Sequence, residues 1–468
     1  MGREEARESV RSEMCRSAAS RARSAEGSNR EVLDRANYLK QVEDKWVRIG
    51  DTEYDVSGFK HPGGSVINYM LTANGADATE AYREFHYRSK KADKYLKSLP
   101  QRPAEGGSLK TGRSRTKGVS SDDVIDADFA VFRAQLEEEG FFEPSPGHTA
   151  YRLAELAAIF GAACVLLRMG HVVASVVLFA LFNGRCGWVQ HEGGHGSLTG
   201  NLWWDKRIQA MTIGFGLGSS GDMWNSMHNK HHATPQKAGH DMDLDTTPLV
   251  AFFADAVETN RPRPYSGLWL KFQAWTFLPV TSGILVMGFW LLFLHPRNVL
   301  KKGKWEEGAW MLAAHVARTA LVAHLAQVSY LHAYGLVWAA FWAAGMYLFG
   351  HFSTSHTHLD VVDLTENPSW VRYAVEHTVD IDTHKPWVNW IMGYLNCQVV
   401  HHMFPQMPQF RQPEVSKRLK AFCDKHGLRY QVLSYWGAWY ETFANLSRVG
   451  HHYHEKSKRP NLEHAKAA

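Results

Sequence analysis

Three short clusters of histidine provide the main chemistry in this chain. Histidine is the commonest metal-ligating side chain, and the chain has 26 of them in 468 residues. Spacings of three and four residues place side chains on one face of a helix, so each cluster is predicted to present its imidazoles to one point. The clusters contribute His191 and His195, then His228, His231 and His232, and finally His401 and His402. These imidazoles exceed what one ion needs, so the sequence predicts a site for two ions.

The ligand types favour iron over zinc. Zinc takes four ligands, usually with cysteine or a carboxylate among them, whereas the five cysteines here stand singly and form no CxxC pair. Imidazole-rich sites with open positions for oxygen suit non-haem iron. We therefore expect two non-haem irons, with O2 as the co-substrate. A further ligand is expected from the histidines that follow the last long apolar stretch, where His356 is preferred to His351 and His358.

A second kind of metal centre is predicted nearer the N-terminus. The motif His61-Pro62-Gly63-Gly64 is followed by His86, with apolar residues between them. Proline fixes φ and the two glycines lack Cβ atoms, so the backbone can run close to a flat macrocycle. Two imidazoles that face each other would fill both axial positions of a haem iron, which leaves no open site for oxygen and suits one-electron transfer. The sequence therefore predicts a haem b held by His61 and His86.

Long apolar stretches lie next to the three clusters. Five stretches approach the ~20 residues that span a ~30 Å hydrocarbon core, and Trp and Tyr near their ends fit the membrane interface. The stretches cover residues 150–167, 171–189, 275–294, 309–330 and 333–350. The sequence therefore predicts a protein that crosses a membrane several times.

The two kinds of metal centre must share one side of the membrane if electrons are to pass between them. This requires an even number of spans between the haem motif and the first cluster. It also requires an even number between the second cluster and the third. Lys and Arg follow the stretch 275–294, and positively charged loops prefer the cytosol. We therefore expect about four spanning helices, formed by the hairpin 150–189 and the pair 309–330 and 333–350. The stretch 275–294 is expected to lie in the interface or to re-enter.

The remaining chain divides by composition. We expect a disordered leader at 1–40, a haem domain at 41–100, a linker at 101–124, a membrane domain at 125–450 and a polar tail at 451–468. The haem domain should contain strands at 46–49 and 53–56, and the membrane domain should begin with an amphipathic helix at 126–139. The predicted fold is thus a small α+β haem domain fused to an all-α membrane domain with a cytosolic helical cap. The net charge of +5 is nearly balanced, which argues against nucleic acid as a partner.

With these motifs, residues 45 to 450 resemble front-end fatty acid desaturases that carry an N-terminal cytochrome b5 domain, whose axial haem ligands match His61 and His86. In that family the third cluster begins with glutamine, as Gln398 does here. The resemblance implies that Gln398 ligates iron or holds a water on it. Most relatives carry Ile-Glu where this chain has Val399-Val400, so a carboxylate near the ligands is missing.

Longer motifs make the resemblance more specific. The segments 187–190, 221–227, 233–237 and 241–248 are similar to the Δ6 desaturases of marine green microalgae, which use acyl-CoA. The resemblance implies oxygen-dependent Δ6 desaturation of linoleoyl- and α-linolenoyl-CoA. It also implies electron supply by NADH-cytochrome b5 reductase, and a multi-pass position in the endoplasmic reticulum membrane with both centres facing the cytosol.

Three alternatives stay open at this stage. A Δ5 front-end desaturase of C20 acyl chains and a sphingolipid Δ8 desaturase share the same machinery and fused domain. A membrane-anchored cytochrome b5 electron carrier with metal-transporting histidine clusters belongs to a different class. The carrier predicts metal sites inside the spans, whereas these clusters lie at or beyond the ends of the apolar stretches.

Overall fold

The structure is a computed structural model of the chain. It describes residues 45–63, 67, 77–104, 121–237, 241, 246, 249–254, 267–362 and 368–458. The predicted leader 1–40 lies outside the described residues, as do positions 105–120 of the predicted linker and 459–468 of the predicted tail.

The N-terminal unit contains a three-stranded antiparallel sheet and two short helices. Its elements are β1 (Trp46–Ile49), β2 (Thr52–Asp55), α3 (Thr79–His86), α4 (Lys90–Leu96) and β3 (Gln101–Pro103). The strand order is β1-β2-β3, with Trp46 paired to Asp55 and Thr52 to Pro103. Gly50 makes the β1–β2 turn with a φ of 63°, a conformation that glycine adopts at little cost. The predicted α+β haem unit is confirmed, with its second strand one residue earlier than expected.

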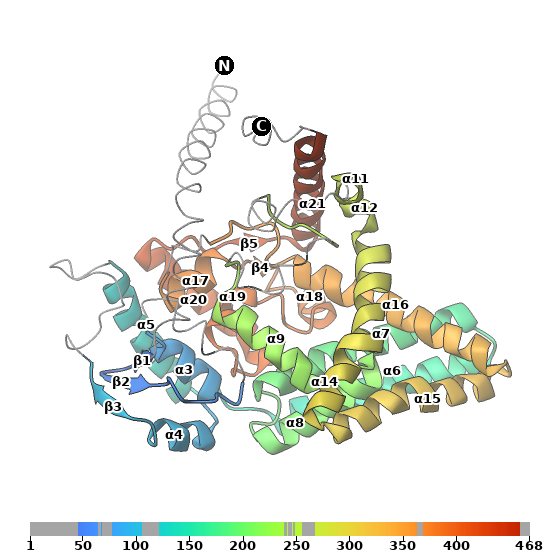
Figure 1. Cartoon of the computed structure of the whole chain (residues 1–468), viewed down its shortest axis with the longest axis horizontal. Coiled ribbons are helices and arrows are strands. Elements are labelled where there is room, and N and C mark those ends of the chain that lie inside the picture. Colours follow the sequence, from blue (N-terminus) through green and yellow to red (C-terminus); the bar gives the residue numbers. More distant parts are fainter. Residues whose placement is uncertain are drawn as a thin grey trace, which may run out of the picture.

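Five helices in the described part of the chain are long and apolar enough to cross a membrane, by length and composition. Four of them, α6, α7, α15 and α16, run alongside one another (Figure 1). The fifth is continuous from Gln273 to Lys302. The bounds are α6 (Pro146–Arg168), α7 (Val172–His195), α12 (Gln273–Thr276), η3 (Phe277–Val286), α13 (Met287–Phe289), η4 (Trp290–Leu294), α14 (His295–Lys302), α15 (Trp305–Ala326) and α16 (Tyr330–Ser353).

The fifth apolar helix, α12–α14, crosses the other four instead of running with them (Figure 1). At its start the Gln273 amide donates to the carbonyl of Leu446, 2.8 Å away in the C-terminal helix. At its other end Nδ1 of His295 accepts the N–H of Ser220 at 2.8 Å. Both ends therefore contact segments that surround the histidine clusters. By length and composition this helix could also cross a membrane, so the expectation that the stretch 275–294 lies in the interface or re-enters stays a prediction.

Glycines allow α7 and α16 to approach closely. A Cβ on Gly184 would collide with the ring of Tyr347, and one on Gly187 would lie 2.7 Å from a methyl group of Leu348. Small residues permit this backbone approach between membrane helices. The contact fixes the end of α7, where the first histidine cluster lies.

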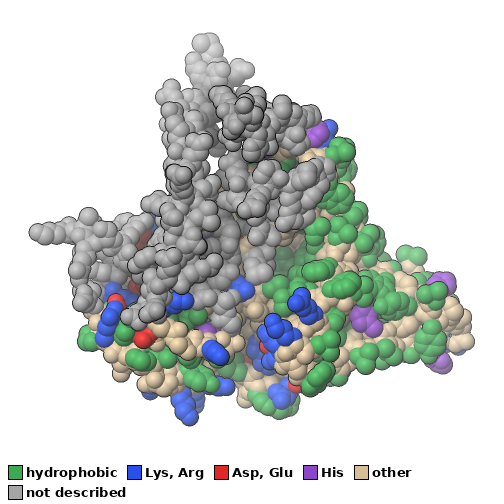
Figure 2. All heavy atoms as spheres, viewed as in Figure 1, with side chains coloured by type: hydrophobic (Ala, Val, Ile, Leu, Met, Phe, Trp, Pro, Cys, Tyr) green, Lys and Arg blue, Asp and Glu red, His purple; other side chains and the backbone are tan. Residues whose placement is uncertain are grey.

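The surface of these helices is apolar. Figure 2 shows hydrophobic side chains over α12–α16, whereas Lys and Arg gather over the haem domain and near α14. Among the strongly exposed apolar side chains are Trp275, Phe293, Leu312 and Leu331. A large contiguous apolar surface marks a membrane or protein contact, so this face fits lipid.

The remaining helices form a cap over one end of the membrane helices. They are α5 (Ser121–Glu138), α8 (Leu202–Met211), η2 (Thr212–Gly216), α9 (Gly221–Ala233), α11 (Gly267–Lys271), α17 (Trp370–Glu376), α18 (Pro386–Ile391), α19 (Gln398–Met403), η5 (Gln409–Arg411), α20 (Gln412–His426) and α21 (Tyr435–Lys458), with a parallel pair β4 (Asp380–Ile381) and β5 (Val432–Leu433). The largest cap core joins α5, α17, α19 and α20. There the rings of Phe129 and Phe404 stack with centroids 5.4 Å apart.

The predicted linker contains structure at both ends. β3 occupies its first three residues, and α5 begins at Ser121 instead of near residue 126. β3 is included in the sheet because it pairs with β2, a tertiary contact that composition does not reveal. The domain boundaries themselves stay a prediction.

Candidate metal centres

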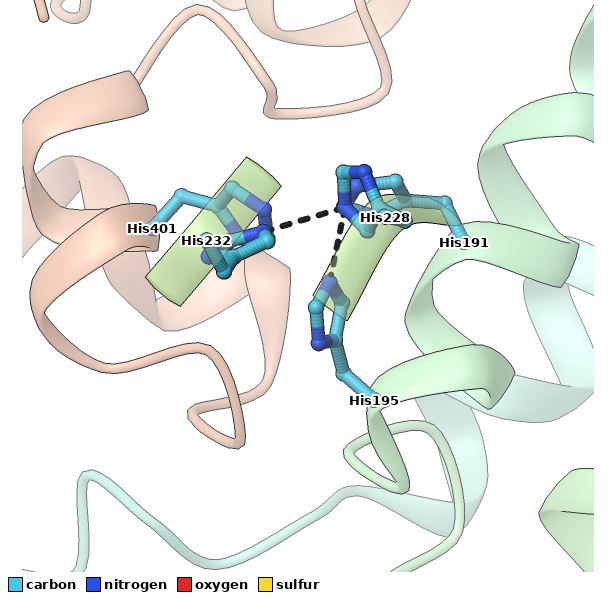
Figure 3. Close-up of side chains that lie close together, drawn as sticks. All are labelled: His191, His195, His228, His232 and His401. Atoms are coloured by element: carbon cyan, nitrogen blue, oxygen red, sulfur yellow. Dashed lines mark hydrogen bonds between the residues drawn. The ribbon is translucent and has the colours of Figure 1, made fainter. Parts of the chain in front are cut away.

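Five histidines from three helices meet at one point in the cap. His191 and His195 lie in the last two turns of α7, His228 and His232 in α9, and His401 in α19. One nitrogen from each lies within 4.8 Å of the others. The Nε2 atom of His228 is 3.1 Å from that of His195 and 3.0 Å from that of His232 (Figure 3). We call these five residues the first group.

Three further histidines form a second group beside the first. His231 of α9, His402 of α19 and His356, which follows α16, place their ligand atoms within 4.8 Å of one another. The Gln398 amide nitrogen is 2.7 Å from Nε2 of His356 and 3.3 Å from Nε2 of His402. The rings of His402 and His232 stack with centroids 4.2 Å apart, so the two groups share a wall.

The division into two groups corrects one expectation. The second and third clusters were predicted to present their imidazoles to one point each, but α9 sends His231 to one group and His232 to the other. α19 divides His401 from His402 in the same way. Consecutive helical residues point about 100° apart, so each adjacent pair serves two neighbouring sites.

His356 is the member of the 351–358 segment that joins a group. Both ring nitrogens of His351 are engaged, with Nδ1 2.6 Å from the carbonyl of Tyr347 and Nε2 2.9 Å from the hydroxyl of Tyr435. His358 belongs to neither group among the described residues. The sequence preference for His356 thus agrees with its position.

The side chains present fit metal ions. All eight histidines are buried, and several ring nitrogens, including Nε2 of His191 and both nitrogens of His401, have no hydrogen-bond partner. Burial, reinforced by neighbouring imidazoles, holds the pKa of His228, His356 and His402 well below the usual value. These rings are therefore neutral and offer lone pairs, which metal binding requires.

Two side chains other than histidine, those of Asp241 and Gln409, orient imidazole rings in the two groups. Both carboxylate oxygens of Asp241 lie 2.9 to 3.0 Å from Nδ1 of His231, which leaves Nε2 for a metal. The Gln409 amide lies 2.9 Å from Nδ1 of His191, and the Gln409 N–H donates to Glu192 at 3.0 Å. Such outer partners fix ring orientation and ligand basicity. The sequence analysis did not assign these roles: Asp241 lies in a quoted motif, whereas nothing in the sequence singles out Gln409.

The two histidines of the predicted haem site face each other across one cavity, whereas Gly64 of the motif lies outside the described residues. The rings of His61 and His86 have centroids 6.0 Å apart across a cavity of about 360 Å³. Nδ1 of His86 is 3.1 Å from the carbonyl of Tyr82, so its Nε2 is available to the cavity. The cavity walls are mostly apolar, with Val47, Ile67, Ala81, Leu96 and Leu99 among them. Two opposed imidazoles in an apolar crevice fit a haem.

A second cavity, of about 420 Å³, leads from the metal groups into the membrane helices. Its inner end reaches His228, His231 and His356. Its walls include Leu217, Val250, Phe277, Met287 and Leu348. Ligand pockets typically occupy about 300–1,000 Å³, so the cavity fits a long apolar chain with one segment beside the metal groups.

These features define a class: a membrane protein whose buried histidines form two adjacent metal groups next to an apolar cavity, with a haem unit on the same side. The Fatty acid desaturase family model matches residues 169–434, more than half of the chain. The Cytochrome b5-like Heme/Steroid binding domain model matches residues 29–101. The chain belongs to the fatty acid desaturase family.

Curated relatives match most of the chain. It is 46% identical over 410 residues to an acyl-lipid (8-3)-desaturase of Rebecca salina, with 86% of this chain and 91% of the relative covered. An acyl-lipid (8-3)-desaturase of Thraustochytrium sp is 42% identical over 426 residues, with 90% and 95% covered. Human fatty acid desaturase 3 is 28% identical over 433 residues, with 88% and 91% covered.

The protein is therefore a front-end desaturase with a fused cytochrome b5 domain and several membrane helices. Its cytochrome b5 haem domain and histidine groups are consistent with a diiron desaturase. An acyl substrate and electron transfer through the cytochrome b5 domain follow from this membership.

Proposed function

We propose that the protein is a Δ6 desaturase of C18 polyunsaturated acyl-CoA, with linoleoyl- and α-linolenoyl-CoA as substrates. The observation that carries the proposal is the lining of the second cavity, of about 420 Å³, which we call the acyl cavity. Gly187, Gln190, Trp224, Met227 and Thr246 all lie on its wall. Each belongs to a segment that resembles the green microalgal Δ6 enzymes, so three of the four resembling segments contribute to the wall of this cavity, which supports the proposal.

The side chains take the following roles. The first group would hold one iron and the second group the other, with Gln398 as a ligand or as the partner of a bound water. Asp241 and Gln409 fix the orientations of the His231 and His191 rings. His61 and His86 would hold the haem. The apolar cavity excludes water and presents one pair of methylenes to the histidine groups.

The bound groups would supply the chemistry that no side chain offers: the iron pair activates oxygen, and the haem delivers electrons one at a time. Overall, the acyl chain loses two hydrogens from adjacent carbons. Together with O2, two electrons and two protons, this gives one double bond and two waters. We propose NADH-cytochrome b5 reductase as the electron source and the endoplasmic reticulum as the location, with both centres facing the cytosol.

A second candidate is Δ5 desaturation of C20 chains, or desaturation of chains esterified in lipids. Two relatives above 40% identity are named acyl-lipid (8-3)-desaturases. Their names favour a lipid-bound substrate and a position other than the one proposed here.

Expression in yeast with fed fatty acids tests the proposal. Cells receive C18 precursors (linoleic and α-linolenic acid) or a C20 precursor in separate cultures, and gas chromatography locates new double bonds. We expect Δ6 products from both C18 acids, appearing in the acyl-CoA pool before the lipid pool. His191→Ala serves as the inactive control. Products from the C20 acid alone, or products that appear first in lipids, would contradict the proposed substrate.

A further inference from the structure

Phe85 lies between the two metal centres. It directly precedes His86 in α3 and lines the haem cavity. Its ring meets the ring of His232 edge-on, with centroids 6.2 Å apart. Phe85 is thus bonded along the chain to a proposed haem ligand and touches a proposed iron ligand through space.

The backbone around Phe85 is fixed by the cap. The Gln406 amide donates to the carbonyl of Phe85 at 2.7 Å and accepts the N–H of Arg88 at 3.1 Å. The residue directly before it, Glu84, forms a buried ion pair with Arg133 of α5 at 2.5 Å. These contacts hold the end of α3 against the cap, so the Phe85–His232 contact does not depend on a loose tether.

The haem cavity itself opens towards the first group. Gly194, His195 and Ala233, all from the membrane and cap helices, form part of its wall. The haem cavity and the first group are therefore close neighbours. Among the described residues that line this cavity, the rings of Phe85 and His195 both contact the ring of His232, and of these two Phe85 is the one outside the first group.

We propose that Phe85 couples the two centres electronically and that Gln406 positions it. Each turnover requires two transfers, and each takes one electron from the reduced haem, which becomes ferric, to the iron pair, where O2 is the final acceptor. A π-system in van der Waals contact offers better electronic overlap than an aliphatic side chain or a gap. Because His195 also borders the cavity, loss of the ring slows transfer instead of abolishing it. The inference rests on the proposed roles of His86 and His232.

Phe59 provides a matched control. It lines the same cavity and its ring meets that of His61, with centroids 6.1 Å apart. In the described part of the chain its ring contacts are with His61 and Tyr95, and not with a histidine of either group. Phe59→Leu and Phe85→Leu therefore alter haem packing similarly, but only the second removes the contact with His232.

Stopped-flow spectroscopy of the purified full chain, loaded with haem and iron, tests the inference. The chain is reduced without oxygen by three equivalents of electrons, two for the iron pair and one for the haem, and is then mixed with O2 and acyl-CoA. Turnover oxidises the iron pair, and the haem absorption then reports the transfer of the haem electron to it. We expect Phe85→Leu to slow reoxidation several-fold with haem content, haem spectrum and non-haem iron unchanged. Phe85→Tyr should keep the original rate, and Phe59→Leu should slow reoxidation much less than Phe85→Leu does. Gln406→Leu, which removes both backbone contacts, should slow reoxidation as well.

Two results would overturn the inference. One is a Phe85→Leu chain that reoxidises at the original rate, and the other is a Phe59→Leu chain that slows equally. A different failure is recognisable: if haem in the unaltered chain transfers no electrons to the non-haem site, the proposed function fails together with the inference.

Discussion

His351 and His356 lie five residues apart, and their hydrogen bonds give them different roles. Both nitrogens of His351 are used by Tyr347 and Tyr435, whereas His356 faces His231 and His402. A metal needs a free lone pair on a neutral ring. The contacts therefore assign His351 to the scaffold and His356 to the second group.

The first prediction follows from this difference. His356→Ala should lose the iron of the second group and all desaturation, because only His231, His402 and Gln398 are left there. His351→Ala should keep its iron and lose stability by about 1–3 kcal/mol, the cost of leaving buried partners unsatisfied. Metal analysis of the two purified variants checks the pair. Full iron in His356→Ala would remove His356 from the ligand set.

Asp241 supports the second prediction. Its carboxylate holds Nδ1 of His231 at 2.9 Å, and removing such an outer partner typically lowers metal affinity or activity about 10–100-fold. Asp241→Asn should therefore release iron faster to a chelator. Asp360→Asn is the control, because the Asp360 side chain is exposed and its ion pair with Arg429 is long, at 3.9 Å. Equal iron release from both variants would argue against the orienting role.

At the scale of elements, the short helix α19 depends on a carboxylate from β4. Oδ1 of Asp380 accepts the N–H of Val399 at 2.8 Å, and Oδ2 accepts the hydroxyl of Tyr430 at 2.5 Å. The Val399-Val400 pair brings no carboxylate of its own to this helix. Asp380 therefore supplies a buried acid to the same helix from another part of the chain, although it contacts the backbone and not a ring.

The third prediction concerns pH. Burial raises the pKa of Asp380 from 3.8 to about 6. The folded chain thus holds this proton more tightly than the unfolded chain. Its contribution to the free energy of unfolding is greatest below pH 3.8 and is lost as the pH rises through about 6. A shift of this size corresponds to about 3 kcal/mol.

Asp380→Asn keeps an acceptor for Val399 but cannot titrate. Between pH 5 and pH 7.5 the original chain should lose more thermal stability in detergent than the variant does. The difference should match what the tighter proton binding of Asp380 in the folded chain predicts. Identical pH slopes for the two Tm values would mean that Asp380 does not titrate in this range.

The fourth prediction concerns the packing of α7 against α16. A Cβ on Gly184 would meet the ring of Tyr347, whereas one on Gly161 of α6 would meet nothing within 4 Å. Overpacking typically costs about 1–3 kcal/mol, so Gly184→Ala should lower Tm in detergent. Gly161→Ala should leave Tm unchanged or slightly higher, because alanine favours helix. A lower Tm for Gly161→Ala alone would contradict this packing.

At the scale of the whole molecule, local sequence patterns predicted the separate motifs and helices but not which residues contact one another. The haem motif, the histidine clusters and the apolar stretches are short-range signals, and the stretch 150–167 lies within the observed helix Pro146–Arg168. Helical spacing alone did not reveal that adjacent histidines serve different groups. Gln409 and Phe85 gain their roles through contacts between distant segments, which no local periodicity records. Asp241 contacts His231, ten residues before it, and helical spacing does not reveal this contact because Asp241 lies beyond the end of α9.

The arrangement also favours a desaturase over a metal-transporting electron carrier. The histidine groups lie at the cap end of the membrane helices, beside both the haem cavity and the acyl cavity. A transport pathway would place metal ligands inside the spans. The positions therefore suit a reaction at the membrane surface with a substrate chain drawn from the lipid side.

Metal stoichiometry of the purified, active full chain tests the central claim most directly. Elemental analysis gives total iron and zinc, and the haem absorption spectrum gives haem, so that non-haem iron is obtained by difference. The fifth prediction is one haem and two non-haem irons for each chain, with the haem alone lost in His61→Ala. Zinc in place of the non-haem iron, or a chain that desaturates with iron only in its haem, would contradict it.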